Sequence, residues 1–278
     1  MDVLKEMDSK SIDLICCDLP YGQTHNKWDT SIPMEDYIFL NGKCLSKEKY
    51  FLQQYKKGIS YQEANKLWND QHQTGLWTEY KRLIKDNGAI ILFGTGAFSA
   101  YLIQSNLKMY RYSLIWHKKQ PGGFLNARRM PLKTHEDILV FYKKLPVYHP
   151  QMSHGHKRKV SSSTSQKKSK ESSNYASYME NRVSYDSTDR FPTSIWTFSK
   201  DTQKSAYHPT QKPVSLLEEI IKTYSNEGDT VLDNCMGSGS CGVACANTGR
   251  YFIGIEKDTR YFVVASQRIC HNSGTLGN

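Results

Sequence analysis

The feature that most constrains the fold is a run of alternating elements near the C-terminal end. Residues 230–235 predict a short strand, with Val231 and Leu232 as its buried residues, and a glycine-containing loop over 236–240 leads into a helix predicted over 241–247. A second apolar segment over 251–255 predicts another strand, which ends in Glu256. Because strands joined through helices lie parallel in one sheet, this stretch predicts an α/β fold.

The same stretch has the chemistry of a ligand site. Gly237 and Gly239 allow the backbone to approach a ligand, and the next helix offers free N–H groups to an anion. Glu256 lies about 20 residues after Gly237, where an acid accepts hydrogen bonds from ribose hydroxyls. The loop lacks the third glycine of a dinucleotide site, and Asp233 precedes it. These residues favour a ligand with a carboxylate, an ammonium and a ribose, and S-adenosylmethionine has all three.

The earlier part of the chain continues the same alternation. Gly94-Thr95-Gly96 is interpreted as a tight turn into a helix, because no acid follows it at the distance that a cofactor loop requires. The predicted strands cover residues 12–17, 89–93, 110–117 and 137–142, and the helices 76–85, 96–103, 213–224 and 261–269.

The first of these strands ends in Asp18-Leu19-Pro20-Tyr21-Gly22. Open α/β sheets bind ligands beyond the carboxyl ends of their strands. A carboxylate and a neighbouring carbonyl accept hydrogen bonds from an amino group, and a tyrosine stacks on a base. The pentapeptide alone is a weak signal, because an ordinary turn at the end of a strand has the same residues.

Composition excludes several classes of protein. The chain has 278 residues, 38% of them hydrophobic and 23% charged, with no apolar run long enough for a membrane span. The N-terminus has no signal-peptide pattern, so we expect an intracellular protein. Seven cysteines without a Cys-x-x-Cys pair disfavour a zinc ribbon, and we expect no metal. The net charge of +10 favours a polyanionic partner.

Two segments interrupt the alternation. Residues 34–74 predict a surface insertion with two short helices, to which we assign no chemistry. The tract over 154–170 contains six basic residues and no acidic residue, and aromatic residues follow it. This combination favours contact with nucleic acid over a solvated linker. The basic residues are Lys157, Arg158, Lys159, Lys167, Lys168 and Lys170.

Four segments in order resemble the amino-group DNA methyltransferases of the β arrangement. The segments are Asp18-Leu19-Pro20-Tyr21, the stretch from Trp116-His117-Lys118 to His135-Glu136, the signature His208-Pro209-Thr210-Gln211-Lys212-Pro213, and Asp233-Asn234-Cys235-Met236-Gly237-Ser238-Gly239-Ser240. The resemblance implies a single Rossmann-like S-adenosylmethionine-dependent methyltransferase domain with circularly permuted motif order and an inserted target recognition region. It divides the chain into a catalytic half over 1–148, the recognition region over 149–205 and a cofactor-binding half over 206–278.

The resemblance also assigns residue roles. Asp18, Leu19, Pro20 and Tyr21 are the catalytic motif, in which the Leu19 carbonyl replaces that of the family's first proline. His208, Thr210 and Lys212 become cofactor-binding residues, as do Asp233, Cys235, Gly237, Gly239, Ser240 and Glu256. Cys235 stands where the family has a phenylalanine near the cofactor adenine, and Ser240 keeps the hydroxyl of the family's threonine.

The implied reaction is methylation of the N6 amino group of a flipped-out adenine in double-stranded DNA, because Asp at the first motif position favours adenine. N4-cytosine methylation and a catalytically silent DNA-binding subunit stay open, and an RNA substrate is an alternative polymer. A C5-cytosine mechanism is set aside, since none of the nine prolines precedes a cysteine. A nicotinamide-dependent oxidoreductase is disfavoured by the short glycine loop. We expect a cytoplasmic monomer or homodimer of bacterial or phage origin, with a restriction endonuclease as a partner that the family allows.

Overall fold

The computed structural model divides the chain into two compact units, Pro150–Thr193 and the remainder, Met1–His149 with Ser194–Asn278. The structure describes residues 2–22, 31–40, 43–162, 184–201, 207 and 211–273. The smaller unit falls inside the segment 149–205 predicted as the recognition region, whose role stays a prediction.

The larger unit is built on a seven-stranded sheet with the order β11-β10-β1-β4-β6-β5-β9. These strands are β1 (Ile12–Cys17), β4 (Ile84–Gly94), β5 (Tyr110–Gly122), β6 (Lys133–Phe141), β9 (Ile195–Phe198), β10 (Thr230–Asp233) and β11 (Tyr251–Gly254). All six strands predicted from the sequence are present, which confirms the α/β class.

One strand of this sheet runs against the others. β1 pairs in parallel with β4 and β10, and β10 pairs in parallel with β11. β6 is antiparallel to both of its neighbours, with Gly94 of β4 opposite Asp137. The reversal brings the first residues of β6 to the edge where the parallel strands end. Acidic residues at the start of β6 therefore join those at the ends of the other strands.

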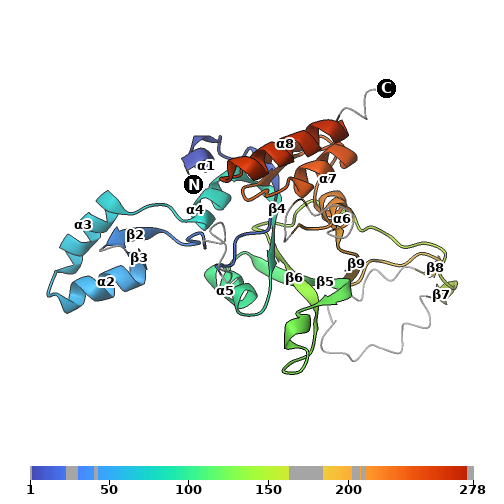
Figure 1. Cartoon of the computed structure of the whole chain (residues 1–278), viewed down its shortest axis with the longest axis horizontal. Coiled ribbons are helices and arrows are strands. Elements are labelled where there is room, and N and C mark those ends of the chain that lie inside the picture. Colours follow the sequence, from blue (N-terminus) through green and yellow to red (C-terminus); the bar gives the residue numbers. More distant parts are fainter. Residues whose placement is uncertain are drawn as a thin grey trace. The chain divides into compact units, whose positions relative to one another are not determined.

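Helices cover both faces of the sheet. One core contains Ile15 and Cys17 of β1 and is covered by α1 (Asp2–Glu6), α4 (Leu76–Leu83) and α5 (Ala97–Ser105). The opposite core contains Leu14 and Cys16 and is covered by α6 (Val214–Tyr224) and α7 (Ser240–Thr248). α8 (Thr259–Ser273) lies against α7 (Figure 1). The alternation along β1 places successive side chains in different cores.

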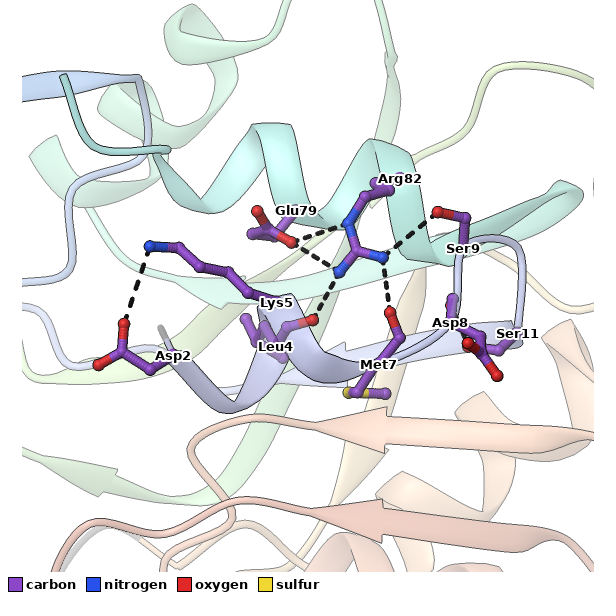
Figure 2. Close-up of polar contacts among 9 residues, drawn as sticks. All are labelled: Asp2, Leu4, Lys5, Met7, Asp8, Ser9, Ser11, Glu79 and Arg82. Atoms are coloured by element: carbon purple, nitrogen blue, oxygen red, sulfur yellow. Dashed lines mark hydrogen bonds and ion pairs between the residues drawn. The ribbon is translucent and has the colours of Figure 1, made fainter. Parts of the chain in front are cut away.

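The entry into β1 is held by one arginine of α4. Arg82 donates from both terminal nitrogens to backbone carbonyls, to Leu4 and to Met7, each at 2.6 Å (Figure 2). It also forms an ion pair of 2.8 Å with Glu79, whose side chain is 5% exposed. Arg82 therefore adds side-chain donors to carbonyls at the end of α1, where the Leu4 carbonyl also accepts a hydrogen bond of 3.3 Å from the Met7 N–H.

Helix α4 ends earlier than the sequence pattern predicts. The pattern indicates a helix to residue 85, but α4 ends at Leu83 and β4 begins at Ile84. Ile84 pairs with Ile12 of β1 and is 4% exposed. Pairing at the start of the sheet overrides the helical periodicity here.

The predicted insertion is a small folded module with its own core. It contains the antiparallel hairpin β2 (Tyr37–Leu40) and β3 (Lys43–Ser46), followed by α2 (Lys47–Lys56) and α3 (Tyr61–Gln71). The two helices were predicted and the hairpin was not. Its core residues are Ile38, Tyr50, Ala64 and Trp68.

The smaller unit contains the short antiparallel pair β7 (Lys159–Ser161) and β8 (Tyr185–Ser187). Arg158 donates to both carboxylate oxygens of Asp186, at 2.7 and 2.6 Å, on the exposed surface.

The remaining element of the larger unit is a short 3-10 helix over Phe124–Asn126. No helix in the described ranges is long and apolar enough to cross a membrane.

Candidate active site

Three acidic residues gather where parallel strands of the sheet end. Asp18 directly follows β1, Asp233 is the last residue of β10, and Glu256 comes shortly after β11. Since these strands are adjacent and parallel, their carboxyl ends share one edge. This is the edge at which open α/β sheets bind ligands.

The glycine loop is shaped by backbone conformations that favour glycine. Gly237 and Gly239 have φ angles of 50° and 77°. A Cβ atom at Gly239 would lie 2.8 Å from the Cβ and 2.9 Å from the Cα of Ala265 in α8. The loop therefore packs directly against the backbone of that helix, and a larger residue at Gly239 forces the two apart.

Glu256 holds this loop through hydrogen bonds. Its Oε2 accepts from the Gly237 N–H at 2.9 Å, and its Oε1 accepts from the Asp258 N–H at 2.8 Å. A carboxylate has about four acceptor positions, so Glu256 can still accept hydrogen bonds from ribose hydroxyls. The acid predicted for ribose binding is thus also a fixed part of the loop.

Asp233 is buried, and its burial disfavours the ionised form of its carboxyl group. It is 6% exposed, and burial raises the pKa of its carboxyl group to about 7. Its Oδ1 accepts a hydrogen bond of 3.0 Å from the Cys235 N–H, which partly opposes this rise. A cation placed beside Asp233 would favour its charged form.

Asp18 is held by an aromatic pair. The hydroxyl of Tyr21 donates to Asp18 Oδ1 at 3.0 Å, and the Tyr21 ring stacks on Phe98 with centroids 4.5 Å apart. Leu19 is 3% exposed and packs in the core beside β1. Its burial fixes the backbone where the family's proline ring would do so.

Lys212 lies beside Asp18. Its Nζ contacts Asp18 Oδ2 and stands 3.4 Å from Oε2 of Glu136, near the start of β6. The other oxygen of Glu136 contacts Lys118, near the end of β5. Two cations and two carboxylates therefore alternate at this edge of the sheet.

Taken with this geometry, the sequence matches the N6/N4 DNA methylase family over residues 12–267. The chain belongs to this family. The match confirms the β-arrangement amino-group DNA methyltransferase identified from the motifs, with S-adenosylmethionine as cofactor.

Individual relatives of the methylase are distant. It is 27% identical to the type II methyltransferase M.HinfI of Haemophilus influenzae, over 97% of this chain and 66% of that protein. The structure of the M1.HpyAVI–SAM complex is similar, with a TM-score of 0.52 and 22% identity over 96% of this chain and 94% of that one. PvuII DNA methyltransferase, which is cytosine-N4-specific, gives a TM-score of 0.53 at 12% identity, covering 98% and 88%. These two structures support the fold.

Several predicted cofactor residues of the methylase lie together. Ser240 begins α7 and is buried, and Cys235 is half-buried beside the core that contains Cys17. Lys212 contacts Asp18, so the structure connects it with the catalytic motif. His208 and Thr210 lie outside the described residues.

Two residues that support the methylase loop were missed from the sequence. The Ser238 hydroxyl donates to Gln211 Oε1 at 3.3 Å, and Arg268 of α8 donates to the Ser238 carbonyl. Arg268 also lies 4.6 Å from the Tyr207 ring centroid. Gln211 stands inside a motif that was recognised, whereas Arg268 carries no local signal.

The predicted DNA contacts of the methylase are only partly described. Lys157, Arg158 and Lys159 are exposed, and Arg158 is paired with Asp186. Lys167, Lys168 and Lys170 lie outside the described residues. Within the described ranges, no group of three His, Cys, Asp or Glu side chains is arranged to hold a metal.

Proposed function

We propose that this methylase transfers a methyl group to the N6 amino group of adenine in double-stranded DNA. The observation that carries the proposal is the position of Asp18. Its carboxylate stands at the carboxyl edge of β1, beside the end of β10 from which the glycine loop starts. An acceptor for the amino group and a site for the methyl donor therefore share one edge.

The amino nitrogen of adenine is a poor nucleophile, because its lone pair is delocalised into the ring. Asp18 and the carbonyl of Leu19 would accept hydrogen bonds from its two N–H groups and so favour a tetrahedral nitrogen. The same acceptors stabilise the positive charge that grows on the nitrogen as its bond to the methyl carbon forms and the bond between that carbon and the donor's sulfur breaks. One N–H proton would then be lost to water, which leaves a neutral methylated amine. Burial of Leu19 supports this role, since it fixes the carbonyl.

The loop residues fit S-adenosylmethionine, which supplies an electrophilic methyl group when bound. Glu256 suits the ribose hydroxyls, and Asp233 suits the ammonium because a neighbouring cation offsets the cost of its buried charge. The N-terminus of α7 suits the carboxylate. Gly239 allows the loop to pack directly against α8, where a Cβ would collide with Ala265.

Tyr21 would stack on the extruded base. Phe98 supports one face of its ring, so a base would stack on the other face. Stacking and hydrogen bonding together hold the nitrogen near contact distance from the donor, and this orientation contributes to the rate.

The choice of adenine rests on Asp18, since N4-cytosine enzymes of the family often have serine at that position. N4-cytosine is the second candidate, because PvuII methyltransferase has the same fold and is cytosine-N4-specific. A catalytically silent subunit is disfavoured by the intact pair of Asp18 and Tyr21.

The smaller unit is proposed as the DNA recognition region, supported by its exposed Lys157 and Lys159. A DNA substrate also supports a location in the bacterial cytoplasm. A cognate restriction endonuclease is a proposed partner, supported by similarity to M.HinfI, a type II methyltransferase.

The proposal is tested by product analysis. Unmethylated DNA and, in a separate reaction, RNA are incubated with the protein and S-adenosylmethionine, digested to nucleosides and analysed by mass spectrometry. N6-methyladenine is the expected product. N4-methylcytosine would refute the assignment of the base, and methylation of RNA alone would refute DNA as substrate.

A further inference from the structure

The inference concerns the cation beside the catalytic carboxylate. Lys212 has a side chain that is 8% exposed, and its Nζ contacts Asp18 Oδ2. The Tyr21 hydroxyl occupies the other oxygen of Asp18. A buried lysine is found almost only with a charged partner, so this contact accounts for the burial of Lys212.

A second carboxylate anchors the same ammonium. Glu136 Oε2 lies 3.4 Å from Lys212 Nζ, while the other oxygen of Glu136 contacts Lys118. The Lys212 Nζ also lies 5.0 Å from the ring centroid of Phe93, at the end of β4. Groups from two strands, β6 and β4, and from the segment after β1 therefore fix the position of this ammonium, which a solvated lysine would not require.

The segment containing Lys212 is tied to the cofactor loop by its neighbour. Gln211 accepts a hydrogen bond from Ser238, and both residues are buried. Gln211 thus contacts the glycine loop, while Lys212 contacts the catalytic motif. Adjacent residues of one segment connect the two halves of the site.

The surroundings of Asp18 oppose its ionisation. Burial raises the pKa of the Asp18 carboxyl group, Lys212 lowers it, and the negative charge of Glu136 raises it. Tyr21 lowers it through its hydrogen bond, and Asp233 is a further carboxylate at the same edge. Lys212 is the positive group in contact with the carboxylate, so it decides how readily Asp18 ionises.

Lys212 itself stays charged. Burial alone would lower the pKa of its ammonium, but Asp18 and Glu136 outweigh that effect and raise it. For Glu136, burial would raise the pKa, and the two lysines Lys212 and Lys118 lower it below its usual value.

We propose that Lys212 is a positioning residue for the methyl transfer, which holds Asp18 ionised and oriented toward the substrate amino group, and that Glu136 positions Lys212. This assignment rests on the proposed role of Asp18 as acceptor. It replaces the expectation that Lys212 binds the cofactor.

The test is the pH dependence of single-turnover methylation at saturating DNA and S-adenosylmethionine, compared among Lys212→Met, Lys212→Arg, Glu136→Gln and the wild type. A neighbouring opposite charge lowers a carboxyl pKa by about 1–3 units. Lys212→Met should therefore move the acidic limb of the profile upward by about 1–3 units. Lys212→Arg keeps the charge and should restore the limb toward the wild-type position.

Glu136→Gln provides a control of opposite sign. Removing the negative charge should move the acidic limb downward, because Glu136 raises the pKa of Asp18. If Lys212→Met does not fold, the shift in Glu136→Gln still tests the proposed role of Lys212. Calorimetric affinity for S-adenosylmethionine should change less than threefold in each variant.

An unmoved limb in Lys212→Met, or shifts of the same sign in Lys212→Met and Glu136→Gln, would overturn the inference. If Lys212→Met loses affinity for S-adenosylmethionine while the acidic limb of its pH profile is unmoved, Lys212 would be a cofactor-binding residue. Failure of the underlying function is seen separately in Asp18→Asn, since full turnover in that variant removes Asp18 from the mechanism whatever Lys212 does.

Discussion

Glu256 accepts a hydrogen bond of 2.9 Å from the backbone N–H of Gly237, so the acid after β11 holds the loop after β10. Two strands that are adjacent in the sheet are thereby linked across the cofactor side of the site. Replacing Glu256 should disturb both the loop and the hydrogen bonds to a ribose.

The first prediction is that Glu256→Gln weakens S-adenosylmethionine binding by about 10- to 100-fold. A hydrogen bond to a charged group contributes about 1.5–3 kcal/mol, and the amide offers one acceptor oxygen instead of two. Calorimetry measures the change, with Glu218→Gln as a control because Glu218 accepts an exposed hydrogen bond from Asn247, near the end of α7. Equal affinity in Glu256→Gln and the wild type would refute this role.

A second prediction concerns Gly239→Ala, which should destabilise the protein by about 2–4 kcal/mol. The φ angle of 77° strains alanine, and its Cβ would meet Ala265 in α8. Gly58→Ala is the matched control, since Gly58 has a φ of 75° and a Cβ there would meet nothing within 4 Å. That variant should lose only about 1 kcal/mol. Equal losses of unfolding free energy in Gly239→Ala and Gly58→Ala, measured by denaturant unfolding, would show that the contact with α8 is unimportant.

The third prediction follows from the raised pKa of Asp233. The folded-state pKa of about 7 lies above the usual value of 3.8, so the folded protein binds this proton more tightly than the unfolded chain. Stability from this group is present below about pH 4 and is lost as the pH rises through 7. Asp233→Asn should remove that loss, so its melting temperature should exceed that of the wild type at pH 8 and approach it at pH 4. The same difference in melting temperature between Asp233→Asn and the wild type at pH 4 and at pH 8 would contradict this prediction.

The same group should link cofactor binding to proton release. If the ammonium of S-adenosylmethionine favours the charged form of Asp233, binding at pH 6 releases a proton. Titration calorimetry in two buffers of different ionisation enthalpy measures the release. Binding heats that do not depend on the buffer would exclude Asp233 as the group beside the ammonium.

A fourth prediction concerns Arg82→Ala, which should cost about 2–4 kcal/mol of stability. The substitution leaves Glu79 buried without its cation and removes the donors to the Leu4 and Met7 carbonyls (Figure 2). Lys5→Ala is the control, because its contact with Asp2 is 3.7 Å long and exposed, and it should cost less than about 1 kcal/mol. Similar unfolding midpoints for both variants would refute the account.

The sequence predicted the parts of the site that have local signals. Asp18 and the glycines of the loop each follow a strand whose apolar pattern is visible in the chain. The contact between Lys212 and Asp18 joins residues 194 positions apart, and nothing near either residue indicates it. The position of Glu136 beside this pair depends on the reversed direction of β6, and no local pattern encodes that direction.

The hairpin of the insertion was missed for a different reason. Asn41-Gly42 between two apolar segments is the strongest short-range hairpin signal, but only two helices were expected in this insertion. The end of α4 was misplaced because Ile84 fits both a helical stripe and a buried strand. Pairing with Ile12 decides between them, and that pairing is a long-range contact.

The central claim is that Asp18 is the acceptor for the substrate amino group, and Asp18→Asn tests it most directly. The asparagine keeps the shape of the side chain but loses the charge and one acceptor oxygen. The measurement is single-turnover methyl transfer to DNA, with calorimetry of S-adenosylmethionine in parallel. The account predicts a fall in rate of about 100-fold or more with cofactor affinity nearly unchanged. A rate close to that of the wild type would contradict it.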